Sequence, residues 1–113
     1  MQRARENAAH NGIGNAHFHA ADLAKDLSAE PWMRERFDRL LPDPPRSGAD
    51  FVLAHLPLKQ FSRIVYVSCH PGSLARDAGW LVKEGGWRLR AAGVMDMFPH
   101  TAHVESIAMF EAA

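Results

Sequence analysis

The sequence is poor in several features that mark whole classes of protein. Its 113 residues hold one cysteine, Cys69, so the chain has no internal disulfide and cannot by itself build a four-cysteine zinc site or an iron–sulfur cluster. No apolar run approaches the roughly 20 residues of a membrane-spanning helix, and the chain opens without a signal-peptide core. We therefore expect a cytoplasmic protein with no membrane partner.

The chain also has no net charge. The 13 basic and 13 acidic side chains cancel, so total charge argues neither for nor against a polyanionic partner, although a local basic patch stays open. A Gly-rich dinucleotide loop is missing too, because Gly12-Ile13-Gly14 lacks the third glycine and follows a predicted helix instead of a strand. What is present is 47% hydrophobic residues, enough for one modest core.

Helical and strand patterns alternate along the chain. Periodicity and end signals predict helices over residues 1–10, 31–37, 49–58 and 73–83, the last capped by Ser73, and a helical turn over 23–27. Apolar or alternating runs predict strands over 16–20, 37–41, 63–69, 87–97 and 103–110. This order predicts an α/β fold, with a parallel sheet, crossover helices and an antiparallel pair of C-terminal strands at one edge.

The buried strand predicted over residues 63–69 delivers Cys69 to its C-terminal end, and Pro71 stops it. In open α/β sheets ligands bind at this edge, so the thiol is a candidate nucleophile. A free cysteine is also among the most often buried residues and behaves as a small hydrophobe. Position gives access to a ligand but not activation, so both interpretations stay open at this point.

Polar residues at other predicted strand ends form a second group of candidates. Asp22 follows the strand over 16–20, and the proline-rich loop over 42–48 holds Asp43 and Arg46 in defined directions. A simple turn with a solvated Asp and Arg is the alternative for that loop. His17 and His19 share a strand face, but no third metal ligand follows at a convincing spacing, so a surface or core pair is favoured over a metal site.

Three segments, taken together, resemble one family. They are Asp43-Pro44-Pro45-Arg46-Ser47-Gly48, then Ser68-Cys69-His70-Pro71 with Leu74-Ala75-Arg76-Asp77 after it, and Asp96-Met97-Phe98-Pro99-His100-Thr101-Ala102-His103-Val104-Glu105. In order and rough spacing they resemble the C-terminal catalytic half of the RNA uracil-5-methyltransferases. The final segment is most similar to the branch that acts on large-subunit (23S) ribosomal RNA, with the transfer-RNA enzymes as the near alternative. The resemblance extends over essentially the whole chain.

The resemblance implies a chemistry for two residues. Cys69 matches the nucleophile that adds to carbon 6 of uracil, which makes carbon 5 able to take a methyl group from S-adenosylmethionine. Glu105 matches the base that removes the carbon 5 proton before the thiolate leaves. One departure stands beside the thiol, where this chain has His70 and the family usually has asparagine.

The same resemblance implies a cofactor site and a fold. Asp22 and Asp43 correspond to positions that line the S-adenosylmethionine pocket, while the roles of Arg46 and Arg76 stay open. The fold implied is an incomplete Rossmann-like class I methyltransferase fold that lacks its first two strands, so residues 1–113 would be the C-terminal part of a truncated domain. We expect a missing N-terminal segment or a dimer to complete the sheet, and weak or no cofactor binding by the chain alone.

Two other functions are weighed against this one. An inactive remnant that only binds RNA or a partner protein is the alternative from a different class. A cysteine hydrolase using Cys69 with His70 or His100 is disfavoured, because adjacent residues on a strand point to opposite faces and no acyl-transfer signature surrounds them.

Overall fold

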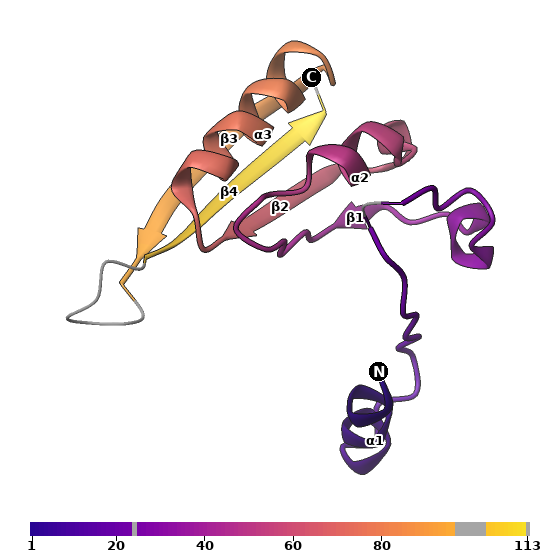
Figure 1. The fold of residues 1–113 in the computed structure, drawn as a ribbon. Helices are drawn as coiled ribbons and strands as arrows, with labels where there is room; N and C mark the ends of the chain where they lie inside the picture. Colours follow the sequence, from indigo (N-terminus) through magenta and orange to yellow (C-terminus); the bar gives the residue numbers. More distant parts are fainter. Residues whose placement is uncertain (24, 97–103, 113) are drawn as a thin grey trace.

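The structure, a computed structural model, describes residues 1–23, 25–96 and 104–112. Helices and strands alternate through most of this length, with two short 3-10 helices between them (Figure 1). The elements in chain order are α1 Gln2–His10, η1 Pro31–Arg34, β1 Arg39–Leu40, α2 Asp50–His55, η2 Leu58–Gln60, β2 Arg63–Ser68, α3 Pro71–Lys83, β3 Trp87–Met95 and β4 Glu105–Ala112.

The described strands form one mixed sheet in the order β1-β2-β4-β3. β1 and β2 run parallel, while β4 is antiparallel to both β2 and β3. The predicted antiparallel pairing of the two C-terminal strands is confirmed. The predicted parallel sheet is present only as the β1–β2 pair, because β4 inserts between β2 and β3 and so pairs with the thiol-bearing strand directly.

One face of the sheet carries the hydrophobic core. Along β2 and β4 every second side chain is buried, as expected when one face packs against helices. Both α2 and α3 lie against this face (Figure 1). The core side chains between the sheet and the two helices include Leu53 of α2, Leu74 and Leu81 of α3, Ile64 and Tyr66 of β2, and Ala108 and Phe110 of β4. On the opposite face, Val65 and Val67 of β2 and Ile107 and Met109 of β4 are half-buried.

α2 ends earlier than its apolar pattern predicts. It stops at His55 instead of reaching residue 58, because the next residue but one is Pro57. A proline disfavours helical geometry in the residue before it, and Leu56 accordingly adopts an extended conformation with φ −78° and ψ 148°. The chain then makes the short η2 turn and enters β2 through the buried Phe61.

The N-terminal region departs most from the sequence prediction. α1 forms where expected, but it buries none of its residues and lies apart from the sheet (Figure 1). Residues 16–20 were predicted as a strand and are not one, and the described residues of 23–27 form no helical turn. A strand needs a neighbour to satisfy its backbone groups, and no described strand lies beside residues 16–20. Residues 31–37 form only the short η1 instead of an α-helix.

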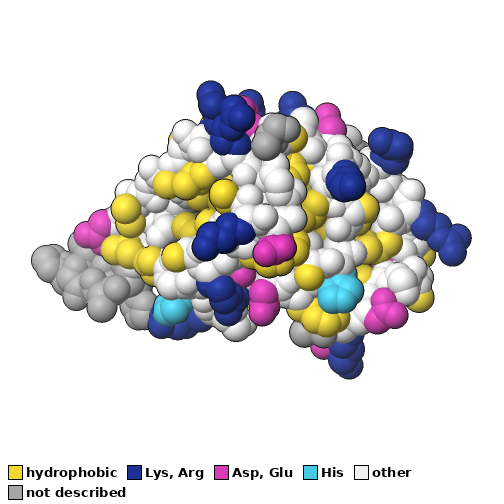
Figure 2. All heavy atoms as spheres, turned by 90° about the horizontal axis from the view of Figure 1, so that it is seen from above, with side chains coloured by type: hydrophobic (Ala, Val, Ile, Leu, Met, Phe, Trp, Pro, Cys, Tyr) yellow, Lys and Arg dark blue, Asp and Glu magenta, His cyan; other side chains and the backbone are white. Residues whose placement is uncertain are grey.

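Charged side chains are spread over the surface. Figure 2 shows lysine and arginine side chains scattered over one face of the molecule, with acidic side chains and apolar surface between them. Several are paired, as in the ion pairs of Glu111 with Arg63 (3.1 Å) and Arg90 (3.3 Å) on neighbouring strands. Exposed pairs of this kind contribute little to stability.

Candidate active site

The thiol of Cys69 lies at the C-terminal end of β2, as predicted. The alternation of β2 buries Ile64, Tyr66 and Ser68 beneath the helices, whereas Val65 and Val67 lie on the opposite face. Cys69 is a free cysteine of intermediate exposure, neither sealed in the core nor fully in solvent. It is therefore accessible to a ligand, as a nucleophile must be.

Glu105 is the first residue of β4, the strand that pairs with β2. The last paired residues of β2 and β4 are Ser68 and Ser106, and Cys69 follows the first while Glu105 precedes the second. Because the strands are antiparallel, Cys69 and Glu105 leave this pair in the same direction, on neighbouring strands. Cys69 follows the last residue of β2 in a bend, so the register places the two residues at the same end of the β2–β4 pair. The fold thus brings together two residues that are 36 positions apart in sequence.

His70 begins the helix that follows the thiol. It is the N-cap of α3, and its Nδ1 accepts a hydrogen bond from the Ser73 N–H at 3.1 Å. The prediction that Ser73 caps this helix was wrong by three residues, because Pro71 is already the first helical residue, a position that suits proline. The Ser68 hydroxyl fixes the same turn, donating to the His70 carbonyl at 2.8 Å and accepting from its N–H at 3.0 Å.

The cap also explains how the chain accommodates His70 where the family usually has asparagine. Asparagine is a preferred N-cap because its side-chain oxygen accepts from the third residue of the helix. The imidazole Nδ1 of His70 provides the same acceptor. Since Nδ1 is engaged in the cap, the residue has a structural role at the start of α3.

The proline-rich loop is held against β2 and α3. At its start, the Pro42 carbonyl accepts from the Val67 N–H at 2.9 Å, which extends the β1–β2 pairing. At its end, a turn closes with a 2.9 Å hydrogen bond from the Gly48 N–H to the Pro45 carbonyl. Asp43 lies between these points with its side chain exposed. These hydrogen bonds tie both ends of the loop to neighbouring backbone.

Asp22 and Asp43 line neighbouring hollows beside this loop. Asp22 lines one of about 350 Å³ between residues 21–23 and the loop, and Asp43 lines one of about 260 Å³. The two hollows share the apolar residues Leu23, Pro44, Ala49 and Val52. Asp22 also forms an ion pair with Lys25, with Oδ2 and Nζ 3.9 Å apart. The structure thus places the two predicted carboxylates at neighbouring hollows that share apolar walls next to α2.

A comparison with family models matches nearly the whole chain. The sequence model of the tRNA (Uracil-5-)-methyltransferase family matches residues 3–113. The chain belongs to this family. The match takes in the proline-rich loop, the thiol at the end of β2 and Glu105 at the start of β4.

Curated proteins similar to this chain are named as uracil methyltransferases of 23S rRNA. The chain is 72% identical, over 111 residues, to the 23S rRNA (uracil(1939)-C(5))-methyltransferase RlmD of Stenotrophomonas maltophilia strain K279a. It is 71% identical to the protein of that name from Xanthomonas euvesicatoria pv. vesicatoria and 69% identical to that from Xylella fastidiosa strain Temecula1, again over 111 residues. These matches cover 98% of this chain and 25% of each relative. The chain therefore spans about a quarter of the length of the curated relatives it matches.

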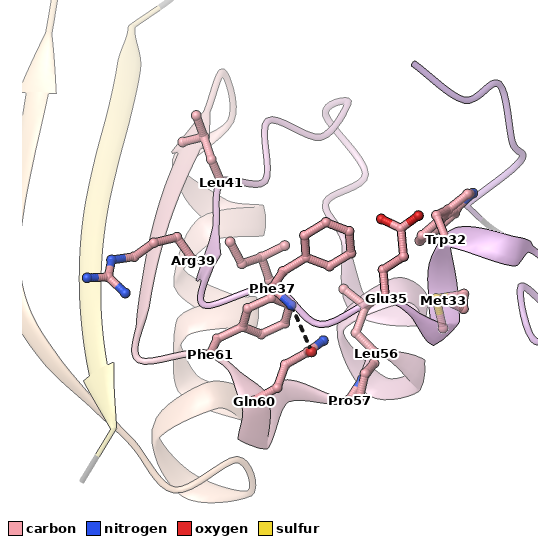
Figure 3. A pocket seen from close by; sticks show the side chains of 11 residues that line it. Trp32, Met33, Glu35, Phe37, Arg39, Leu41, Leu56, Pro57, Gln60 and Phe61 are labelled. Carbon is pink, nitrogen blue, oxygen red and sulfur yellow. Dashed lines mark hydrogen bonds between the residues drawn. The ribbon is translucent and has the colours of Figure 1, made fainter. Parts of the chain in front are cut away.

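A further apolar hollow lies beside β1 and shares Trp32, Leu40, Leu41 and Leu56 with the hollow that Asp43 lines. It measures about 230 Å³ and is lined by side chains that include Trp32, Phe37 and Phe61 (Figure 3). Gln60 closes one side, with its Oε1 accepting from the Phe37 N–H at 3.0 Å. The Trp32 Nε1–H is buried without a hydrogen-bond partner. None of the four predicted site residues lines this hollow.

Two other features, a metal site and a membrane-spanning helix, can be checked in the described residues. Among them, no group of three or more His, Cys, Asp or Glu side chains could hold a metal ion, and no helix is long and apolar enough to cross a membrane. His100, the second partner weighed for a cysteine hydrolase, lies outside the described residues. So do residues 97–103 of the third family segment, of which Asp96, Val104 and Glu105 are described.

The sequence interpretation missed one residue of structural weight, Asp77. It lies on the inner stripe of α3 with Ser73, Leu74 and Leu81, and only 1% of it is exposed. Its carboxylate accepts hydrogen bonds from the Tyr66 hydroxyl at 2.5 Å, the Ala49 N–H at 2.8 Å and Arg76 Nε at 3.2 Å. A charged residue within an apolar helical stripe is the signal that could have identified it, because such a residue needs buried partners.

Proposed function

We propose that this chain carries the catalytic residues of an S-adenosylmethionine-dependent methyltransferase that methylates carbon 5 of a uridine in RNA. The observation that supports the proposal is the position of Cys69 and Glu105, each one residue beyond the last pair of β2 and β4 and at the same end of the sheet. A nucleophile and a base are both needed at one uracil ring, since one attacks carbon 6 and the other acts at the adjacent carbon 5. The names of the curated relatives favour 23S ribosomal RNA as the substrate.

Each residue has a defined part in the reaction. The Cys69 thiolate forms a bond to carbon 6 of uracil, and the electron pair of the 5,6 double bond moves toward carbon 5 and the O4 carbonyl. Carbon 5 is then nucleophilic, and S-adenosylmethionine supplies the methyl group. Glu105 takes the proton left on carbon 5, the double bond re-forms, and the thiolate leaves with the electrons of the carbon–sulfur bond.

The residues beside the proline-rich loop fit the methyl donor. An adenosine needs an apolar surface for its base and acceptors for its amino and hydroxyl groups. Leu23, Pro44 and Val52 supply apolar walls, and the Asp22 and Asp43 carboxylates supply acceptors at the adjoining hollows. Asp43 lies in the loop that follows β1, at the carboxyl end of the parallel pair β1–β2. Ligands bind at this end of the strands in α/β sheets.

The sheet supports the assignment of residues 1–113 to the C-terminal part of a Rossmann-like methyltransferase domain. Within the described residues β1 pairs only with β2, so its other edge offers unsatisfied backbone groups. Exposed Phe37 and Leu41 flank this edge. We propose that this edge pairs with strands from the part of the relatives that this chain does not cover. A second copy of the chain is the alternative source of such strands.

A chimera tests the proposal in the context of a whole enzyme. This chain would replace the matching quarter of the Stenotrophomonas maltophilia relative, and methyl transfer from labelled S-adenosylmethionine to 23S ribosomal RNA would be measured. We expect activity in the chimera, none in Cys69→Ala, and an RNA–protein adduct that accumulates in Glu105→Gln because the carbon 5 proton stays in place.

Glu111→Gln is the matched control for Glu105→Gln. Glu111 lies on the same strand and, by the two-residue alternation, on the same face, but at the far end of the β2–β4 ladder. It should keep full activity. A chimera that binds the RNA without methylating it, while the relative does methylate it, would instead support the inactive RNA-binding or partner-binding remnant. Equal loss in the two glutamine variants would refute the role of Glu105.

A further inference from the structure

A buried clamp joins the proline-rich loop to the strand that carries the thiol. Its centre is Asp77, whose Oδ2 accepts from both the Tyr66 hydroxyl of β2 and the Ala49 N–H at the end of the loop. The two donors belong to segments that are not adjacent in sequence and are not paired with each other as strands of the sheet. One carboxylate oxygen therefore fixes the distance between the loop and β2.

Two neighbours of Asp77 on α3 hold the same loop by its carbonyl groups. Arg76 donates from Nη2 to the Ser47 carbonyl at 2.6 Å and, from Nε, to Asp77 Oδ1. Ser73 donates from its hydroxyl to the Arg46 carbonyl. Three residues at the end of the loop and just after it, Arg46, Ser47 and Ala49, are thus bound to Ser73, Arg76 and Asp77 of α3. Asp43 lies just before them.

The loop backbone at Gly48 lies close to side chains of α3. Gly48 has φ +88°, in the left-handed region that favours glycine, and a Cβ atom there would lie 2.8 Å from Asp77 Oδ2 and closer still to Arg76 Nη2. Such contacts are too short for real Cβ atoms. The sequence therefore places a glycine where the clamp leaves no room for a side chain.

We propose that Asp77 is a positioning residue that sets the proline-rich loop, and with it Asp43, against the end of β2. This inference rests on the proposed function, because it assigns the loop to the methyl donor. Asp77 lies on the helix-covered face with Tyr66, while Cys69 continues the opposite alternation of β2, so Asp77 does not touch the reacting atoms. Its loss should therefore disturb donor binding while leaving thiol addition to uracil in place.

Thiol addition can be measured without the methyl donor. Reversible addition of Cys69 to carbon 6 makes the hydrogen at carbon 5 exchangeable, so RNA with tritium at carbon 5 of uridine releases label to water. In the chimera, we expect Asp77→Asn to raise the KM for S-adenosylmethionine roughly tenfold or more, the equivalent of one hydrogen bond to a charged group. Tritium release in the absence of donor should stay within about twofold.

Two further variants keep the test decisive if Asp77→Asn folds poorly. Tyr66→Phe removes one donor to Asp77 and should shift the same KM in the same direction by a smaller factor. Glu84→Gln, an exposed carboxylate just after α3, should change neither quantity. Equal loss of tritium release and donor affinity in Tyr66→Phe, or an unchanged KM in both Asp77→Asn and Tyr66→Phe, would overturn the clamp. An unsubstituted chimera that neither methylates nor exchanges would overturn the proposed function itself.

Discussion

Tyr66 offers a direct test of the buried clamp in the chain by itself. It is the only tyrosine in the sequence, so the absorbance of tyrosinate reports this one side chain. The phenol is fully buried and donates to the Asp77 carboxylate at 2.5 Å. Burial, and then the hydrogen bond and the negative charge of Asp77, raise the pKa of Tyr66 well above its ordinary value of 10.0.

The sign of the pH effect follows from this shift. The folded chain holds the phenol proton more tightly than the unfolded chain does, so the stabilisation is fully present below pH 10.0 and is lost as the pH rises through the folded pKa. Replacing the phenol by Phe removes a buried hydrogen bond to a charged group, worth about 1.5–3 kcal/mol. Asp77 keeps its bonds from Ala49 and Arg76, so we expect the lower half of this range.

Urea unfolding and a spectrophotometric titration together measure both quantities. At neutral pH, Tyr66→Phe should lower the urea midpoint by about 1 M, given a typical denaturant slope for a small domain. The difference from the unsubstituted chain should stay constant up to about pH 9 and shrink above pH 10.0. In Asp77→Asn, the tyrosine pKa should fall toward its ordinary value. A tyrosine that ionises near pH 10.0 in a chain with native circular dichroism would refute the buried pair.

Three further outcomes are expected. Gly48→Ala should destabilise the chain by about 1–2 kcal/mol for the left-handed backbone alone, measured by urea unfolding, and more if Arg76 and Asp77 cannot move aside; an unchanged midpoint would contradict the close approach. His70→Asn should keep the stability of α3, whereas His70→Ala should cost about 1 kcal/mol for the lost cap, and equal stabilities would show that the cap contributes nothing. Calorimetry on the chain alone should detect weak or no binding of S-adenosylmethionine, since the hollows beside Asp22 and Asp43 are open on one side, and a micromolar affinity would argue against this expectation.

Local patterns were enough to predict the elements that pack against one another. β2, β3, β4 and α3 lie close to their predicted positions, because apolar alternation and helical periodicity are imposed by a core that is present in this chain. The strand predicted over residues 16–20 failed for the opposite reason. Its pattern suits a strand, but no described strand lies beside it, and backbone pairing is not a property of the segment itself.

The position of Cys69 at a strand end could be predicted, but its neighbour could not. The short connection predicted that β3 and β4 pair, which left open whether β3 or β4 lies next to β2. The structure places β4 there, and this strand order puts Glu105 at the same end of the sheet as the thiol. Strand order depends on long-range packing, so the family resemblance supplied Glu105 as a candidate before any geometry did.

Asp77 shows a different limit of pattern analysis. Aspartate is rarely buried, so the position expected for it from sequence alone is the solvent face of a helix. Its burial depends on three donors from β2, α3 and the proline-rich loop, which meet only in the folded chain. The glycine at position 48 was visible in the sequence, but the close approach that requires it was not.

Covalent trapping tests the central claim most directly. RNA that contains 5-fluorouridine carries fluorine where Glu105 must remove a proton, so after methyl transfer the carbon–sulfur bond cannot be released. The chimera, incubated with this RNA and S-adenosylmethionine, would be digested and its RNA-linked peptide identified by mass spectrometry. The adduct should lie on Cys69 and be absent from Cys69→Ala. An adduct on another residue, or one that survives in Cys69→Ala, would contradict the assignment of the thiol at the end of β2 as the nucleophile.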